Sequence, residues 1–210
     1  MNVRVKICGM SRYEDAKTAV GLGVDAVGFI FYGKSPRFIR PADVGAIARK
    51  LPPFVSKVGV FVDEDAMTIN ATIRAAGIDT IQLHGNEDPG FCEQFSCSVI
   101  KAFGVGPRFD LSILGQYKVC GYLLDTWDDT RKGGTGKSFD WSIARRAALS
   151  HDNIVLAGGL GVTNLAEALE TVNPYGIDLN SGVEVKPGEK NPHKMRDALK
   201  IVRRFEQGPG

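Results

Sequence analysis

The strongest constraint on the fold is the alternation of short apolar segments with helix-forming segments along all 210 residues. The apolar segments are continuous hydrophobic runs rich in β-branched residues, which is typical of strands buried on both faces of a parallel sheet. We predict eight strands, at 3–8, 26–31, 57–62, 80–83, 98–103, 121–124, 153–157 and 176–179. Amphipathic helices are predicted between and after them, at 11–22, 41–51, 64–76, 88–95, 110–116, 140–149, 163–172 and 192–205.

Eight such pairs, at roughly 26 residues each, fit a closed (β/α)8 TIM barrel near the lower size limit of that fold. An open doubly wound α/β sheet is the alternative, but it would leave some of the pairs unexplained. No stretch resembles a linker, so we predict a single domain over 1–210, with 206–210 as a frayed tail. Ser11 with Glu14 three residues later predicts a capping box at the first helix.

Composition and charge exclude several classes of function. Hydrophobic residues make up 43% and charged residues 24%, and the net charge of +2 is too small to indicate a nucleic-acid or membrane partner. No apolar run has the roughly 18 residues of a membrane helix, and no export signal is visible, so a cytoplasmic location is expected. The four cysteines form no CxxC pair, and three scattered histidines predict no metal site. No cofactor is predicted.

A barrel places its active-site groups directly after the strands. Cys8 ends the first predicted strand, where a thiol near helix amides would have a lowered pKa and act as a base or nucleophile. An inert core cysteine is the alternative reading of Cys8. Asp125 ends the sixth strand, where partial desolvation would raise its pKa and suit a general acid, although it could instead cap the next loop. Facing each other across the barrel mouth, the two would form an acid–base pair over a small substrate.

Other polar and glycine-rich segments at the same end predict substrate binding. Arg37, after the second strand, offers a bidentate fork for a carboxylate or phosphate, and His84, after the fourth, would line the pocket. The segments 156–161 and 178–184 follow the last two strands, where small residues expose backbone N–H groups to phosphate. The candidates in these two segments are Gly158, Gly159, Asp178, Ser181 and Gly182.

The sequence KGGTGKSFDW at 132–141 contains a GKS tripeptide, but it is not a nucleoside-triphosphate loop. That pattern requires a glycine at position 131, where Arg131 stands. Because this glycine-rich loop follows Asp125, our hypothesis is that it folds over the substrate and shields a reactive intermediate from water.

Several segments together resemble phosphoribosylanthranilate isomerases of tryptophan biosynthesis. The resemblance spans nearly the whole chain, with small departures at Asn180 and Asn191, and rests on KICGM at 6–10, GFIFYGKSPRFI at 28–39, VGVFVD at 58–63, IQLHG at 81–85, LLDT at 123–126, GGTGKSFDW at 133–141, LAGGL at 156–160 and DLNSGVEVKPGEKNP at 178–192.

The resemblance implies an Amadori rearrangement of N-(5-phosphoribosyl)anthranilate to 1-(2-carboxyphenylamino)-1-deoxyribulose 5-phosphate. It implies that Asp125 protonates the furanose oxygen and that Cys8, as thiolate, removes the proton from ribose C2. It also implies that Arg37 holds the anthranilate carboxylate, and that the phosphate is held at Gly158, Gly159, Ser181 and Gly182.

Two other functions remain open from sequence. A sister isomerase acting on a histidine-pathway aminoaldose would perform the same rearrangement, usually with a carboxylate in place of Cys8 and with a clear half-to-half repeat. A non-catalytic barrel that binds phosphoribosyl ligands would need neither Cys8 nor Asp125. The expected partner is a phosphorylated small molecule, and the chain is expected to be a monomer or a homodimer.

Overall fold

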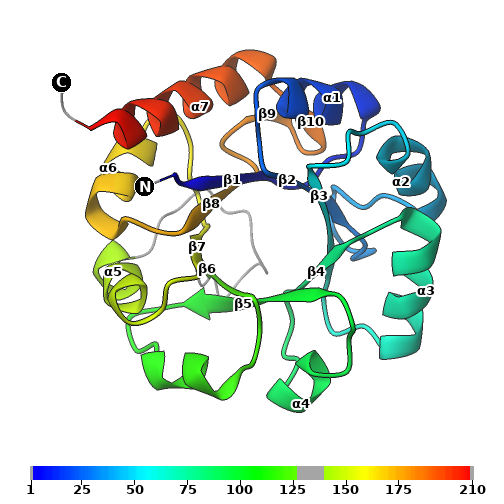
Figure 1. The fold of residues 1–210 in the computed structure, drawn as a ribbon, viewed down its shortest axis with the longest axis horizontal. Coiled ribbons are helices and arrows are strands. Elements are labelled where there is room, and N and C mark those ends of the chain that lie inside the picture. Colours follow the sequence, from blue (N-terminus) through cyan, green and yellow to red (C-terminus); the bar gives the residue numbers. More distant parts are fainter. Residues whose placement is uncertain (1, 127–139, 209–210) are drawn as a thin grey trace.

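Eight parallel strands close into a barrel in the computed structural model, which describes residues 2–126 and 140–208. The strands follow one another around the ring in sequence order, and the first also pairs with the eighth (Figure 1). They are β1 (Arg4–Ile7), β2 (Ala26–Ile30), β3 (Ser56–Phe61), β4 (Thr80–Leu83), β5 (Ser98–Val105), β6 (Gly121–Thr126), β7 (Ile154–Leu156) and β8 (Gly176–Leu179). The predicted (β/α)8 barrel is therefore confirmed.

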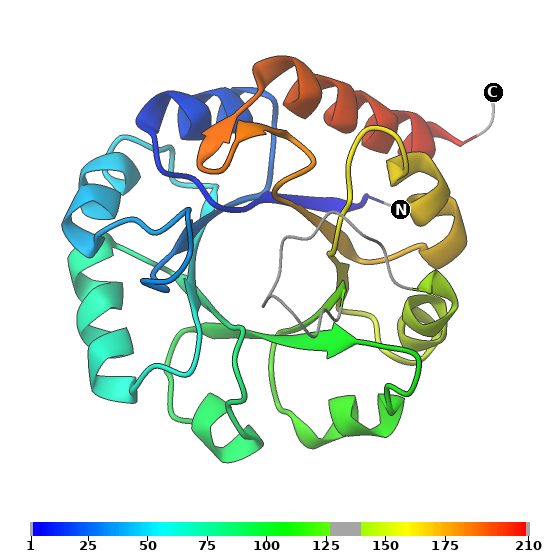
Figure 2. The same cartoon turned by 180° about the vertical axis from the view of Figure 1, so that it is seen from behind.

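Helices surround this ring on its outside in both views (Figures 1 and 2). The α-helices are α1 (Tyr13–Gly21), α2 (Pro41–Ala48), α3 (Ala66–Ala76), α4 (Pro89–Cys92), α5 (Trp141–Ser150), α6 (Leu165–Val172) and α7 (Pro192–Gln207), and the 3₁₀ helix η1 (Leu111–Gln116) lies between β5 and β6. None of the helices in the described residues is long and apolar enough to cross a membrane.

The core has two parts, as the alternation of side chains along a strand requires. Most buried apolar side chains, such as Val5, Ile7 and Phe29, form one cluster between the strands and the helices. A separate small cluster of Ala102, Leu123 and Ala157 packs inside the ring. Towards the ends of the strands the interior also contains the buried polar residues Lys6, Gln82 and Asp178, and the candidate site lies there.

Side-chain caps explain where several helices begin. Asp65, Asp88, Asp110, Asp140 and Asn191 each accept a hydrogen bond from a backbone N–H in the first turn of the helix that follows. A short polar side chain immediately before a helix satisfies an otherwise unpaired amide. These local signals agree with the predicted helix starts to within two residues.

The capping box predicted at the first helix is wrong. The residue that precedes α1 is Arg12, which makes no side-chain cap. The Ser11 hydroxyl instead donates to the carbonyl oxygen of Gly188, far along the chain. A long-range partner has replaced the local one.

The prediction of a frayed tail over 206–210 is wrong at its start. Helix α7 continues to Gln207, and Glu206 Oε1 accepts a hydrogen bond of 2.7 Å from the Val3 amide. This contact ties the end of the helix to the beginning of the chain. Residues 209–210 lie outside the described residues.

A short hairpin after β8 is absent from the sequence predictions. Its strands, β9 (Glu184–Lys186) and β10 (Glu189–Lys190), pair antiparallel around Gly188, whose φ of +83° favours glycine. Both views place the hairpin beside α1, where the Lys190 amide donates to Asp15 (Figures 1 and 2). Runs of two and three residues are too short for an alternating pattern to predict.

Candidate active site

A cavity of about 540 Å³ opens at the carboxyl ends of the strands. This volume suits a small-molecule ligand. The cavity is lined by eight of the nine residues predicted for the site, which lie on or after six of the eight strands: Cys8, Arg37, His84, Asp125, Gly158, Gly159, Asp178 and Ser181. The ninth, Gly182, is not among the lining residues.

Cys8 follows β1 and is a buried free cysteine whose amide donates to the Leu179 carbonyl oxygen. The predicted lowering of its pKa by helix amides is wrong, because α1 does not begin until Tyr13. Burial raises the pKa of the Cys8 thiol, and the Lys6 ammonium acts in the opposite direction. Gly28 leaves room for this thiol, since a Cβ there would lie 2.8 Å from Cys8 Sγ.

Lys6 and Asp178 form a buried ion pair beside this thiol. The two residues are register partners of β1 and β8, and Lys6 Nζ lies 2.7 Å from Asp178 Oδ2. Burial lowers the pKa of Lys6, but the Asp178 carboxylate and the Cys8 sulfur more than offset this, so the pKa lies above its ordinary value. The other oxygen, Asp178 Oδ1, is buried and has no hydrogen-bond partner among the described residues.

Lys6 was missed at the sequence level, although a signal for it was present. Side chains two positions apart on a strand lie on the same face. A lysine two residues before Cys8 therefore had to point into the same barrel interior.

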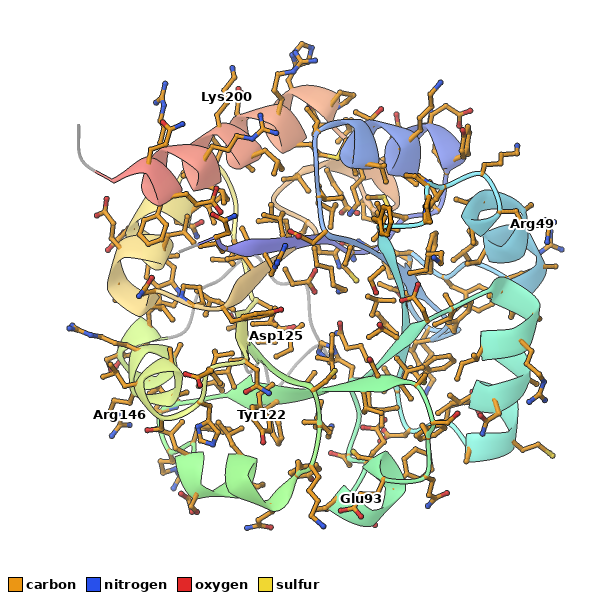
Figure 3. The ribbon with its side chains drawn as sticks, viewed as in Figure 1. Arg49, Glu93, Tyr122, Asp125, Arg146 and Lys200 are labelled. Carbon is orange, nitrogen blue, oxygen red and sulfur yellow. The ribbon has the colours of Figure 1, made fainter. Side chains whose placement is uncertain are left out.

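Asp125 lies at the end of β6, inside the ring of strands, whereas Arg146 and Lys200 lie on helices outside it (Figure 3). The predicted sixth strand, 121–124, ends two residues too early, because β6 continues to Thr126 by pairing with a β5 that is also longer than predicted. The Thr126 amide donates to Asp125 Oδ1 over 2.7 Å. Asp125 Oδ2 lies 3.3 Å from His84 Nε2.

His84 is held from behind by Gln82, a buried residue that the sequence did not single out. Gln82 Nε2 lies 2.8 Å from His84 Nδ1. When the amide donates to Nδ1, the imidazole hydrogen is on Nε2 and points towards Asp125. His84 is thus a partner of the candidate acid as well as a pocket-lining residue.

Arg37 reaches the cavity from the loop after β2, but its guanidinium is already paired. Arg37 Nε lies 2.9 and 3.1 Å from the two carboxylate oxygens of Glu184, and Nη2 lies 2.7 Å from Oε2. Glu184 starts the hairpin that was not predicted, and it was therefore also missed as a residue near the site.

The loops after β7 and β8 lie against each other and against the candidate acid. Gly158 and Gly159 have φ of +85° and +66°, which favour glycine. A Cβ at Gly158 would lie 2.9 Å from Asp125 Oδ1. Gly182 forms an isolated β-bridge with Gly161, and this bridge holds the two loops close together. These glycines leave the backbone near the cavity uncovered, as a phosphate site requires.

The GGTGKS segment and its predicted role as a cover lie outside the described residues. The groups that are described already define a class of protein. A closed barrel whose thiol, carboxyl, imidazole and guanidinium groups come together at the strand ends is characteristic of (β/α)8-barrel enzymes that carry out acid–base chemistry on small anionic substrates.

Comparison with known proteins identifies the family within this class. Residues 5–201 match the family described as N-(5'-phosphoribosyl)anthranilate (PRA) isomerase. The isomerase of this name from Pelobacter propionicus is 45% identical over 201 residues, which cover 96% of each chain. That from Citrifermentans bemidjiense is 48% identical over 193 residues, which cover 92% of this chain and 93% of the other. This chain belongs to the N-(5'-phosphoribosyl)anthranilate isomerase family.

Solved structures agree with this assignment. The isomerase from Thermotoga maritima is 40% identical with a TM-score of 0.90, and that from Thermus thermophilus is 35% identical with a TM-score of 0.89. Another, 38% identical with a TM-score of 0.86, was solved with reduced 1-(o-carboxyphenylamino)-1-deoxyribulose 5-phosphate. In all three comparisons the match covers 96% of this chain and 98% of the other.

Proposed function

We propose that this protein converts N-(5-phosphoribosyl)anthranilate to 1-(2-carboxyphenylamino)-1-deoxyribulose 5-phosphate in tryptophan biosynthesis, by an Amadori rearrangement. The observation that carries the proposal is that Cys8 and Asp125 line one cavity in a chain of this family. A thiol and a carboxyl group that reach one sugar can divide the two proton transfers of the reaction between them.

Asp125 is the general acid of the first step. Its proton goes to the furanose ring oxygen, the bond from that oxygen to C1 breaks, and the anilino nitrogen supplies the electrons that form a protonated Schiff base. The carboxylate left on Asp125 accepts a hydrogen bond from the Thr126 amide, and its Oδ2 lies 3.3 Å from His84 Nε2.

Cys8 is the general base of the second step. As thiolate it removes the proton from C2, and the electrons of that C–H bond neutralise the Schiff base to give an enolamine. The enolamine gains a proton at C1 and loses the proton of the 2-hydroxyl, which gives the ketone. The Lys6 ammonium counteracts the effect of burial on Cys8 and so supports the thiolate form.

The remaining predicted residues bind the two anionic ends of the substrate. Arg37 takes the anthranilate carboxylate, and the backbone at Gly158, Gly159 and Ser181 takes the phosphate. Gly182 supports the phosphate site by its bridge to the preceding loop. Asp178 contributes through Lys6, and its Oδ1, which has no partner within 2–126 and 140–208, is available to a substrate hydroxyl.

The test is to generate N-(5-phosphoribosyl)anthranilate in situ and follow the decay of its fluorescence with and without the protein. Cys8→Ala and Asp125→Asn should each lower turnover about a hundredfold or more while ligand affinity is retained. Cys97→Ala and Asp152→Asn, at positions that do not line the cavity, are matched controls and should keep full turnover.

Two results would contradict the proposal. Absence of wild-type turnover with intact ligand binding would favour a non-catalytic phosphoribosyl binder. Turnover of a histidine-pathway aminoaldose in preference to the anthranilate compound would favour the sister isomerase.

The proposed setting is the cytoplasm, as a monomer or a homodimer. One related isomerase, from Thermotoga maritima, is described as dimeric, with monomers generated from it. Light scattering during size-exclusion chromatography gives the mass in solution, and a mass above that of two chains would rule out both states.

A further inference from the structure

Glu184 is a buried carboxylate placed between two cations at the edge of the cavity. Besides its bidentate contact with Arg37, its Oε1 accepts hydrogen bonds from Lys190 Nζ at 2.8 Å and from the Gly188 amide at 3.1 Å. The side chains of Glu184, Arg37 and Lys190 are 4, 11 and 0% exposed. Burial raises the pKa of Glu184, but the hydrogen bonds from Arg37 and Lys190 outweigh it and hold the pKa below the usual range.

The contact between Arg37 and Glu184 leaves the Nη1 group of Arg37 available to bind a ligand. Glu184 occupies the Nε and Nη2 side of the guanidinium, and within the described residues no hydrogen bond is made by Nη1. A guanidinium has five N–H donors in a fixed plane. Fixing one edge therefore fixes the direction in which the remaining donors point.

The position of Arg37 is also set from its other side. A Cβ at Gly9 would lie 2.7 Å from Arg37 Cδ and 2.7 Å from Asn180 Oδ1, so the Arg37 stem packs directly on the Gly9 backbone. Lys190 Nζ donates to the same Asn180 Oδ1 over 3.0 Å. The guanidinium is confined between Gly9 and Glu184 and keeps little rotational freedom.

The charges in this cluster sum to one positive charge. Arg37 and Lys190 are cations and Glu184 is an anion, so the cluster can receive one further carboxylate without leaving a buried charge uncompensated. Without Lys190, Glu184 would cancel Arg37 and the cluster would have no net attraction for an anion.

We propose that Glu184 is a positioning residue that aims Arg37, with Lys190 restoring the positive charge, so that the site selects substrates bearing an aromatic carboxylate. The inference rests on the proposed function and adds a determinant of specificity to it. Its effect is confined to the carboxylate end of the ligand, whereas a merely structural role of Glu184 would affect all ligands alike.

The experiment compares two stable ligands by calorimetric titration. One is reduced 1-(o-carboxyphenylamino)-1-deoxyribulose 5-phosphate, and the other is the same molecule without the carboxyl group. In Glu184→Gln the Kd of the carboxylated ligand should rise about tenfold, the size of one lost charge-assisted interaction, because the lost orientation of Arg37 outweighs the net positive charge that the substitution adds. The Kd of the ligand without the carboxyl group should change less than about twofold.

Two further variants make the test specific. Arg37→Met should show the same selective loss, and adding Glu184→Gln to it should not weaken the carboxylated ligand any further, because Glu184 acts on that ligand through Arg37. Lys194→Met is the matched control: Lys194 Nζ contacts the backbone oxygen of Glu184 and not its carboxylate, so both Kd values should be unchanged.

Equal weakening of both ligands in Glu184→Gln, or no weakening of either, would overturn the inference. If that variant does not fold, Lys190→Met decides in its place, since it leaves the Arg37–Glu184 contact and removes one positive charge. It too should weaken only the carboxylated ligand. Failure of the proposed function would look different, because the wild-type protein would then bind neither ligand or lack turnover.

Discussion

At the scale of single residues, the chemistry of the site depends on how burial and neighbouring charges act on one thiol. Burial raises the pKa of Cys8, Lys6 lowers it and Asp178 raises it. The proposed base is therefore a thiolate only above its raised pKa, and the buried Lys6 ammonium makes that increase in pKa smaller. The two members of the Lys6–Asp178 pair thus act on the thiol with opposite sign.

This opposition gives a prediction of pH dependence. Because the thiolate is the active form, turnover should increase as the pH rises through the raised pKa of Cys8. Lys6→Met should move this limb of the profile to higher pH, and Asp178→Asn should move it to lower pH. Thiolate absorbance near 240 nm, taken as the difference from Cys8→Ala, measures the pKa of Cys8 without substrate. If Lys6→Met and Asp178→Asn shifted this pKa in the same direction, the opposing effects of the two residues would be contradicted.

A second residue-scale prediction concerns Gly158. A side chain here has an unfavourable φ of +85°, and its Cβ would lie 2.6 Å from the Thr126 amide nitrogen, which holds Asp125 Oδ1, and 2.9 Å from Asp125 Oδ1 itself. Gly158→Ala should therefore displace the proposed acid and lower turnover about tenfold or more. Gly33→Ala is the control, because no atom lies within 4 Å of a Cβ at that glycine, and its turnover should match the wild type. Full activity of Gly158→Ala would show that Asp125 tolerates the displacement.

At the scale of secondary-structure elements, the hairpin β9–β10 and helix α7 bring the carboxyl-terminal part of the chain to the site. The hairpin supplies Glu184 and Lys190, and α7 begins directly after it with Asn191 as its cap. Asn191 accepts from the amides of His193 and Lys194, at 2.9 and 3.2 Å. Asn191 therefore caps the helix that follows the hairpin.

Removing this cap should destabilise the protein moderately. Asn191→Ala is expected to cost about 1 kcal/mol in free energy of unfolding, which lowers Tm by about 2–4 °C for a domain of this size. Asn191→Asp retains an accepting oxygen and should have a Tm close to that of the wild type. Calorimetry of the three proteins gives their Tm values. An equal decrease of Tm in both variants would show that the side-chain NH2 group of Asn191, and not its accepting oxygen, stabilises the protein.

At the scale of the whole molecule, closure of the barrel makes a distinct interior. The pairing of β1 with β8 removes the edges of the sheet, and the enclosed side chains include a small apolar cluster and the buried polar residues Lys6, Gln82 and Asp178. Most apolar burial, and with it most of the stability, lies outside the ring, between strands and helices. The site is therefore free to contain buried charges such as Lys6 and Asp178.

A pair of identical substitutions tests the contribution of the interior cluster. Leu123 is fully buried inside the ring, and Leu149 on α5 is 80% exposed. Leu123→Ala should lower the free energy of unfolding by about 2–5 kcal/mol, the range for a buried leucine that leaves a cavity. Leu149→Ala should change it by less than about 0.5 kcal/mol. Urea unfolding gives both values, and similar costs would mean that the ring interior is not a packed core.

The sequence predicted much of this arrangement correctly. All eight strands were located to within two residues, because each is a continuous apolar run and the runs repeat regularly. Cys8, Asp125 and the glycine segments were predicted as site residues because a parallel barrel gathers the ends of its strands. The end of α7 and the role of Ser11 were wrong because each depends on a partner more than a hundred residues away, and the hairpin was missed because its strands are too short to show a pattern.

The amino-acid sequence by itself determined the alternation of strands and helices, the closed barrel and the family, since these follow from local periodicity and from motifs of adjacent residues. Only the tertiary structure decided the electrostatics of the site. The pairs Lys6–Asp178 and Arg37–Glu184 join residues that are 172 and 147 positions apart, and no local pattern relates them. The physical reason is that a pKa and the aim of a guanidinium depend on distance and burial in space, which exist only once the ring has closed.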